Sequence, residues 1–142
     1  MNWTSIILIA TFAAKATAPS APMHAVLPSD DGAWRDGPSG LPGGRFAVIS
    51  GDPANAGPFV IRVELPPGYT LPPYRRPRDE NIVVLVGAIG VGAGDTFDAA
   101  TMRTLPAGSF IRLPANESHF VMTKLGATVQ VFGTGPFEIS PL

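Results

Sequence analysis

Hydrophobic and polar residues alternate most clearly between residues 59 and 65, where every second residue is a large apolar one. Successive side chains of a β-strand point to opposite faces, so this pattern predicts a strand with one buried face. Residues 82–86 are instead five consecutive apolar β-formers, Ile-Val-Val-Leu-Val. A strand without alternation needs cover on both faces, and we expect that cover from the opposing sheet and the N-terminal segment, or from a partner chain.

Shorter apolar segments between Gly, Pro and Asp residues predict the remaining strands. We expect a tight turn at Gly87, a strand of small residues after it, and stiff turn structure at the prolines of residues 72–77. Residues 24–44 should wrap around the outside of the domain, anchored by Trp34 and Leu41. The other expected strands are residues 45–50, 102–105, 109–113, 119–124 and 128–132, with a terminal edge strand within residues 133–142.

Composition supports an all-β protein. The chain has 142 residues, of which 16 are Gly and 16 are Pro, and such dense turn formers favour many short strands over a helical bundle. Eight or more strands in one domain predict a double-sheet jelly-roll barrel. A net charge of −1 gives no reason to expect nucleic acid as a partner. The absence of cysteine excludes disulfides and Cys-ligated zinc or iron–sulfur sites.

The N-terminus has the pattern of a secretory signal peptide. Residues 6–14 are an apolar run of about half the length that spans a bilayer, and Ala14-Lys15-Ala16 follows as a small-x-small cleavage site. We therefore expect a signal peptide at residues 1–16, an extended tether at 17–25 and a single domain at 26–142. The mature protein would be periplasmic or secreted and would not span a membrane. The alternative is an apolar N-terminal segment that packs on the domain.

Two motifs with regular spacing lie in the second half of the chain. The first is Gly-x5-Tyr-x-Arg-x3-Glu-x6-Gly, running from Gly68 to Gly87. The second is Gly-x5-Pro-x-Asn-x2-His-x3-Thr, running from Gly108 to Thr123. This pair resembles the paired motif of the cupin superfamily, and a Trp, a Leu-Pro, a Gly-Asp-Pro and a Gly-Pro-Phe extend the resemblance to about residues 26–142. The resemblance implies a double-stranded β-helix, that is, a jelly-roll cupin barrel.

The resemblance also implies a metal site, which this sequence alters. In the family, two histidines and a glutamate of the first motif and a histidine of the second bind iron, manganese, zinc or nickel. Here Tyr74 and Arg76 stand at the two histidine positions, whereas Glu80 and His119 remain. Arg76 has no lone pair to donate and repels a cation, and Tyr74 would bind only as a phenolate. We expect no cofactor, or at most a divalent metal held weakly by Glu80 and His119.

Several uses of these residues remain open. Arg76 and Glu80 would form an internal ion pair, because a buried carboxylate without a metal or a cation is costly. Arg76, Tyr74 and His119 would also form a mouth that binds an anion, with Gln130 as a further ligand-binding residue if its face of the strand is internal. His119 and Tyr74 are the candidates for acid–base catalysis, against a purely structural histidine. No catalytic residue can be assigned.

These considerations favour an exported small-molecule binding or structural protein with a degenerate metal centre, whose ligand would be an anion. An alternative is an oxygenase, isomerase or lyase acting on a small polar or aromatic substrate, with or without a metal. A second alternative is a homo-oligomeric assembly protein. The apolar run at residues 82–86 and the low surface charge favour a homodimer. The sequence leaves open whether the protein is an enzyme.

Overall fold

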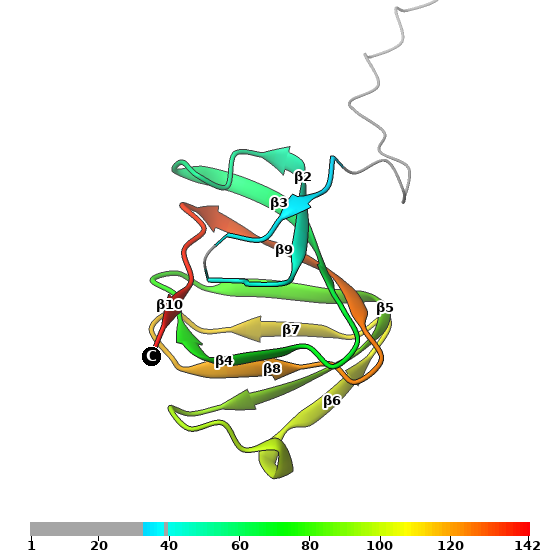
Figure 1. Ribbon diagram of the computed structural model, residues 1–142. Coiled ribbons are helices and arrows are strands. Elements are labelled where there is room, and N and C mark those ends of the chain that lie inside the picture. Colours follow the sequence, from blue (N-terminus) through cyan, green and yellow to red (C-terminus); the bar gives the residue numbers. More distant parts are fainter. Residues whose placement is uncertain (1–32, 39) are drawn as a thin grey trace, which may run out of the picture.

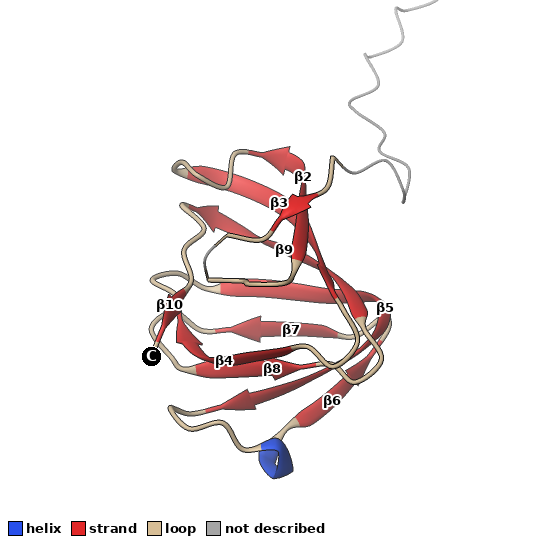
Figure 2. Cartoon of the chain, in the orientation of Figure 1, coloured by secondary structure: helices blue, strands red, loops and turns tan. Residues whose placement is uncertain are grey.

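The computed structural model describes residues 33–38 and 40–142, so the expected signal peptide and tether lie outside the described residues. The described chain consists of β-strands and one short 3-10 turn (Figures 1 and 2). The elements are β1 (Arg35–Asp36), β2 (Arg45–Gly51), β3 (Gly57–Leu65), β4 (Thr70–Arg75), β5 (Glu80–Ala93), η1 (Ala99–Thr101), β6 (Arg103–Pro106), β7 (Phe110–Leu113), β8 (His119–Met122), β9 (Ala127–Gly135) and β10 (Ser140–Pro141).

Two antiparallel sheets share the long strand β5. Its first half pairs with β7 and β9, and β9 continues the first sheet through β3 and β2 to β1. Its second half pairs with β6 and β8, and β8 continues the second sheet through β4 to β10. The two sheets curl around a common interior (Figure 1). This arrangement confirms the predicted all-β jelly-roll.

The predicted tight turn at Gly87 is wrong, because β5 passes through this residue without a break. The strand bends there instead, with φ +74° at Gly87 and a register irregularity between Val84 and Val86. A Cβ atom at Gly87 would lie 2.3 Å from the backbone oxygen of Gly126, so only glycine fits this corner. The bend allows one strand to serve both sheets.

The interior is apolar and follows the predicted alternation of β3. Residues Phe59, Ile61, Val63 and Leu65 are each at most 5% exposed. They lie beside the buried side chains of β5 and β9 in the same core cluster, among them Ile82, Val84, Val129 and Val131. Burial of these side chains is the main source of stability of such a barrel, at roughly 1.5–3 kcal/mol for each large apolar residue.

Leu41 anchors its segment as expected, since it is 5% exposed and belongs to the interior cluster. Two further expectations need correction. Residues 70–75 form strand β4, and two of the three prolines that suggested a turn, Pro72 and Pro73, fall where its register shifts, between Leu71 and Tyr74. In the run 82–86 only the inward residues are covered by the described chain, since Val86 is 62% exposed.

Among the described residues, no helix reaches the length and apolarity required to cross a membrane.

Candidate functional site

The two sequence motifs meet at one end of the barrel. Tyr74, near the end of β4, is the cross-strand partner of His119, the first residue of β8. Glu80 begins β5 and is 5% exposed. The backbone N–H of Asn116 donates to the carbonyl of Arg76 at 2.8 Å, which ties the turn of the second motif to the first. Asn116 has φ 62°, a left-handed conformation that asparagine tolerates better than most residues.

Asp79 strengthens this junction, and sequence reasoning did not select it. Its Oδ1 accepts a hydrogen bond from the backbone N–H of Ala115 at 2.9 Å, and its other oxygen pairs with Arg112 of β7. The hydrogen bond from Ala115, and then the Arg112 guanidinium, hold the pKa of Asp79 below its ordinary value. Asp79 is therefore ionised, and as a carboxylate it positions the loop at Ala115 in front of Glu80.

Arg76 and Glu80 form a buried ion pair. Arg76 Nε lies 2.5 Å from Glu80 Oε2, and the two side chains are only 10% and 5% exposed. The guanidinium carbon lies 3.8 Å from the ring centre of Phe137 and 5.5 Å from that of Tyr74. Nε is buried and lacks the geometry of a hydrogen bond, so its contact with Glu80 is an ion pair only. The internal ion pair that the sequence suggested is thus present.

Tyr74 completes a triad with this pair. Its hydroxyl donates a long hydrogen bond, 3.4 Å, to the same Oε2 atom of Glu80. Burial, and then the negative charge of Glu80, raise the pKa of Tyr74 far above its ordinary value, so the phenol stays protonated. Burial also raises the pKa of Glu80, although the Arg76 charge and the Tyr74 hydroxyl oppose this effect. Tyr74 acts here as a hydrogen-bond donor.

His119 lies beside the triad and is turned toward a residue that sequence reasoning missed. Its Nε2 lies 3.9 Å from Oε2 of Glu117, and its side chain is 7% exposed. Burial lowers the pKa of His119, and the Glu117 charge only partly offsets this, so the imidazole is neutral at neutral pH. Glu117 stands two residues before His119, a spacing that places both on one face of an extended chain and provides the missed signal.

The expectation that Gln130 lines the interior is wrong. Val129 and Val131 of β9 are 4% and 3% exposed and point inward. Because side chains alternate along a strand, Gln130 points to the outer face, where it pairs in register with Val83 of β5. Tyr74, Arg76, Glu80 and His119 are brought together, and Gln130 is not.

These residues do not fit the metal that the resemblance implies. Arg76 forms an ion pair with the carboxylate of Glu80, Tyr74 remains a protonated phenol, and His119 faces Glu117. In the part of the chain that the structure describes, no three His, Cys, Asp or Glu side chains are grouped in a way that could hold a metal ion. The donor set at this end of the barrel is therefore unsuited to a divalent cation.

Beneath the ion pair lies a small cavity between the sheets. Its volume is about 40 Å³, which is room for a few water molecules rather than for an organic ligand. Apart from Tyr74, Arg76 and Glu80, its lining is apolar, and it includes Phe137 and Ile139 from the C-terminal segment. Neither of these two residues was selected from the sequence.

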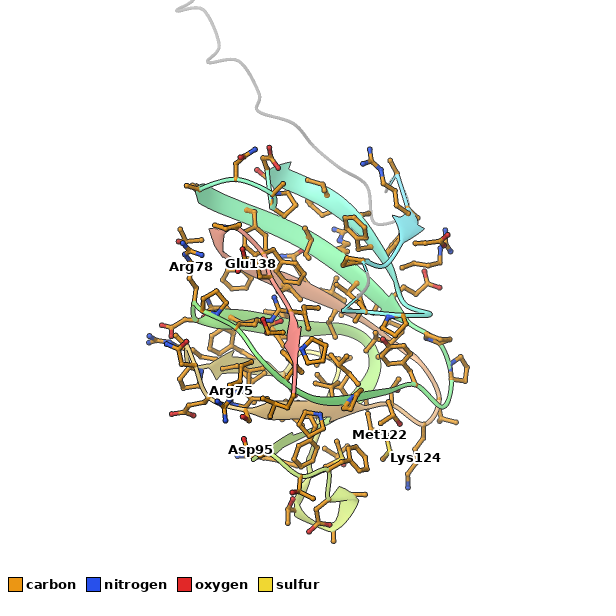
Figure 3. The ribbon with its side chains drawn as sticks, turned by 60° about the vertical axis from the view of Figure 1, so that its left-hand side comes forward. Arg75, Arg78, Asp95, Met122, Lys124 and Glu138 are labelled. Atoms are coloured by element: carbon orange, nitrogen blue, oxygen red, sulfur yellow. The ribbon has the colours of Figure 1, made fainter. Side chains whose placement is uncertain are left out.

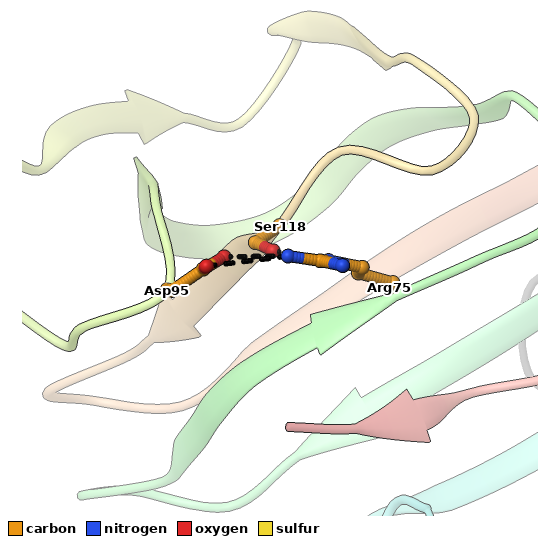
Figure 4. A network of polar contacts seen from close by, with 3 residues as sticks. All are labelled: Arg75, Asp95 and Ser118. Carbon is orange, nitrogen blue, oxygen red and sulfur yellow. Dashed lines mark hydrogen bonds and ion pairs between the residues drawn. The ribbon is translucent and has the colours of Figure 1, made fainter.

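On the outside of the second sheet, the neighbour of Arg76 forms a separate network (Figure 4). Arg75 Nε donates to Ser118 Oγ at 2.7 Å, and Nη2 donates to both carboxylate oxygens of Asp95 at 3.0 and 3.2 Å. The side chains of Arg75 and Asp95 are 47% and 66% exposed. Figure 3 shows both at the surface of the barrel.

No family model and no curated protein matches the chain. Solved structures do. The polyketide cyclase RemF from Streptomyces resistomycificus is 19% identical with a TM-score of 0.64, over 84% of this chain and 86% of that chain. A sugar phosphate isomerase of the cupin superfamily from Silicibacter pomeroyi is 21% identical with a TM-score of 0.61, over 78% and 76%. An RmlC-like cupin from Shewanella frigidimarina is 12% identical with a TM-score of 0.59, over 84% and 93%.

The two antiparallel sheets and the bent strand that they share define a jelly-roll barrel. At these identities the likeness shows the fold alone, and that fold is the cupin fold. This confirms the resemblance that the paired motifs carried.

Proposed function

We propose that this cupin-fold protein binds a small anionic molecule at the end of the barrel, through Arg76 and without a metal. The observation that carries the proposal is the buried Arg76 guanidinium, which lies against Glu80 where the family pattern has its metal ligands. A guanidinium has five N–H donors, and the contact of Arg76 with Glu80 is an ion pair at one of its nitrogens. Its planar fork matches a carboxylate or phosphate group.

The local charge also supports a ligand with a single negative charge. Arg76 and Glu80 cancel, so a dianion would add two negative charges beside a carboxylate in a poorly solvated place. A monoanion adds one. We therefore favour a monocarboxylate over a fully ionised phosphate, and inorganic phosphate is included in the test to decide between them.

The test uses chelator-treated protein and thermal unfolding in the presence of acetate, formate or inorganic phosphate. We expect a saturable rise in stability, which at about 100 times the dissociation constant amounts to about 2.7 kcal/mol. The rise should be lost in Arg76→Met and kept in Arg75→Met, a matched control that removes the adjacent, exposed arginine. Absence of any saturable rise, persistence of the rise in Arg76→Met, or a metal that remains bound stoichiometrically would overturn the proposal.

We also propose that the protein is exported to the periplasm or secreted, on the evidence of its N-terminal pattern. A reporter fused after residue 25 should appear outside the cytoplasm and should stay inside when residues 1–16 are deleted.

Finally, we propose a homodimer. Val86, Phe110 and Leu125 are 62%, 58% and 90% exposed, and burial of such side chains against a second copy would stabilise a dimer. A strict monomer in analytical ultracentrifugation would contradict this assignment.

A further inference from the structure

The C-terminal strap, defined here as residues 136–142, crosses the open end of the barrel. It begins where β9 of the first sheet ends and reaches the edge of the second sheet, where Ser140 and Pro141 pair with Arg75 and Tyr74 of β4. Figure 1 shows this path from the end of β9 to β10. Figure 3 labels Glu138 on the strap. The strap therefore covers the site around Arg76.

The strap places an aromatic ring on the Arg76 guanidinium. The ring centre of Phe137 lies 3.8 Å from the guanidinium carbon, and the ring meets Phe59 edge-on with centres 5.4 Å apart. Ile139 of the strap lines the same cavity. A cation over its face and a second ring nearly perpendicular to it, at 75°, are surroundings that a protein also offers to a bound aromatic molecule. The Phe137 side chain thus fills a site beside the ion pair that suits an aromatic ring.

The strap is held by few contacts apart from these two side chains. Strand β10 has two residues, both exposed, and one of them is a proline without a backbone N–H. Phe137 N–H donates to the carbonyl of Pro53 at 2.6 Å, and Leu142 N–H donates to that of Pro73 at 3.1 Å. Leu142 itself is 60% exposed. A ligand that replaced the Phe137 ring would compete with these backbone contacts, with the pairing of β10 and β4, and with the packing of Phe137 and Ile139.

The size of the cavity makes such a replacement necessary for an organic ligand. A benzene ring occupies a cavity of roughly 150 Å³, whereas the cavity that Phe137 shares with Arg76 has about 40 Å³. A second hollow of about 210 Å³ is also lined by Phe137, but Arg76 does not line it. An aromatic ligand therefore fits against Arg76 only when Phe137 leaves. Its ring would then take the apolar place on Phe59, and a carboxylate on that ring would face the donors of Arg76.

We propose that Phe137 fills a subsite for a planar aromatic monocarboxylate, and that such a ligand binds by displacing the C-terminal strap. This inference rests on the proposed function, because it uses the same guanidinium, and it adds the chemical class of the ligand and the segment that must move. The apolar lining selects an aromatic ring over a short aliphatic acid, and Arg76 selects an acid over a neutral ring.

The first experiment measures binding of benzoate, acetate and benzyl alcohol to the full chain by calorimetry. In Phe137→Ala we expect benzoate to bind about tenfold or more tightly than in the unchanged protein, because the competing ring is gone. The matched control Phe110→Ala removes an exposed ring from β7 and should leave benzoate affinity unchanged. Equal gains for benzyl alcohol and benzoate would indicate simple cavity filling and would overturn the proposal.

The second experiment tests the strap with Phe137 in place. The chain has no cysteine, so Leu142→Cys carries a single nitroxide label on the exposed end of the strap. Benzoate should convert the label to a more mobile spectrum, and acetate at the same concentration should not. An unchanged spectrum at saturating benzoate would overturn strap displacement. If acetate and benzoate stabilise the protein equally, the anion site stands and the aromatic subsite fails. If neither binds, both proposals fail.

Discussion

Arg75 and Arg76 are neighbours in the sequence and opposites in the structure. Arg75 points outward and pairs with Asp95 while 47% exposed, whereas Arg76 points into the barrel and pairs with Glu80 while 10% exposed. An exposed pair contributes about 0–1 kcal/mol to stability, because water screens it and both side chains lose freedom. A buried pair is harder to break, because the partner left behind remains charged out of water. One step along the chain, at the end of β4, thus separates a surface ion pair from a candidate binding group.

The largest effect is expected where the buried pair loses its carboxylate. Glu80→Gln leaves a guanidinium that cannot lose its proton in a poorly solvated place, and we expect a loss of about 3–5 kcal/mol in unfolding free energy. Arg76→Met should cost less, because burial already raises the pKa of Glu80 and the carboxyl group can take up a proton. Urea denaturation at neutral pH measures both. Equal losses in the two variants would contradict this asymmetry.

Removing both partners together should recover most of that loss. The double variant Arg76→Met and Glu80→Leu replaces two charges with apolar side chains beside an apolar cavity, an exchange that is often neutral or stabilising by about 1–4 kcal/mol relative to the intact pair. The same denaturation experiment on the double variant checks this. A double variant as unstable as Glu80→Gln would show that packing, rather than charge, sets the cost.

Much of this arrangement could be predicted from the sequence. The alternation in residues 59–65 and the spacing of the two motifs predict the fold, because both signals depend on local periodicity and on the register of the family. The same motif spacing predicts that Tyr74, Arg76, Glu80 and His119 lie together. The contact between Arg76 and Glu80 then follows from the cost of burying an isolated charge.

The remaining features depend on the path of the chain in space. Phe137 lies in a segment rich in Gly and Pro that has no periodicity, so only the tertiary path places it on Arg76. Gln130 would line the pocket only if its face of β9 were internal, and the buried residues of that strand are instead its apolar neighbours Val129 and Val131. At Gly87 a turn and a bend have the same sequence signal, and the close approach of Gly126 decides between them.

A smaller, pH-dependent effect is expected from His119, which lies on the inner side like Arg76. Burial lowers its pKa in the folded state, so below its ordinary pKa the unfolded chain binds a proton that the folded chain does not. Stability should therefore fall as the pH drops from about 7.5 through the ordinary range of histidine near 6.5, until the folded pKa is passed. The raised pKa of Glu80 acts in the opposite direction at lower pH.

The difference between variants isolates the contribution of His119. Thermal unfolding of His119→Gln between pH 7.5 and about 5 should show a flatter dependence than the unchanged protein. His24, the other histidine of the chain, provides the matched control, and His24→Gln should retain the full dependence. The same slope in both variants would remove His119 as its cause.

The smallest effect is expected at the outer pair. Arg75→Ala and Asp95→Ala should each lower the unfolding free energy by about 1 kcal/mol or less, and a double-mutant cycle should give a coupling of about 0.2–1 kcal/mol. Because both side chains are exposed, 1 M salt should remove most of that coupling, whereas the coupling of Arg76 with Glu80 should survive it. If salt instead weakened both couplings equally, the inner pair would be solvated much as the outer one is, and the contrast between the adjacent arginines would fail.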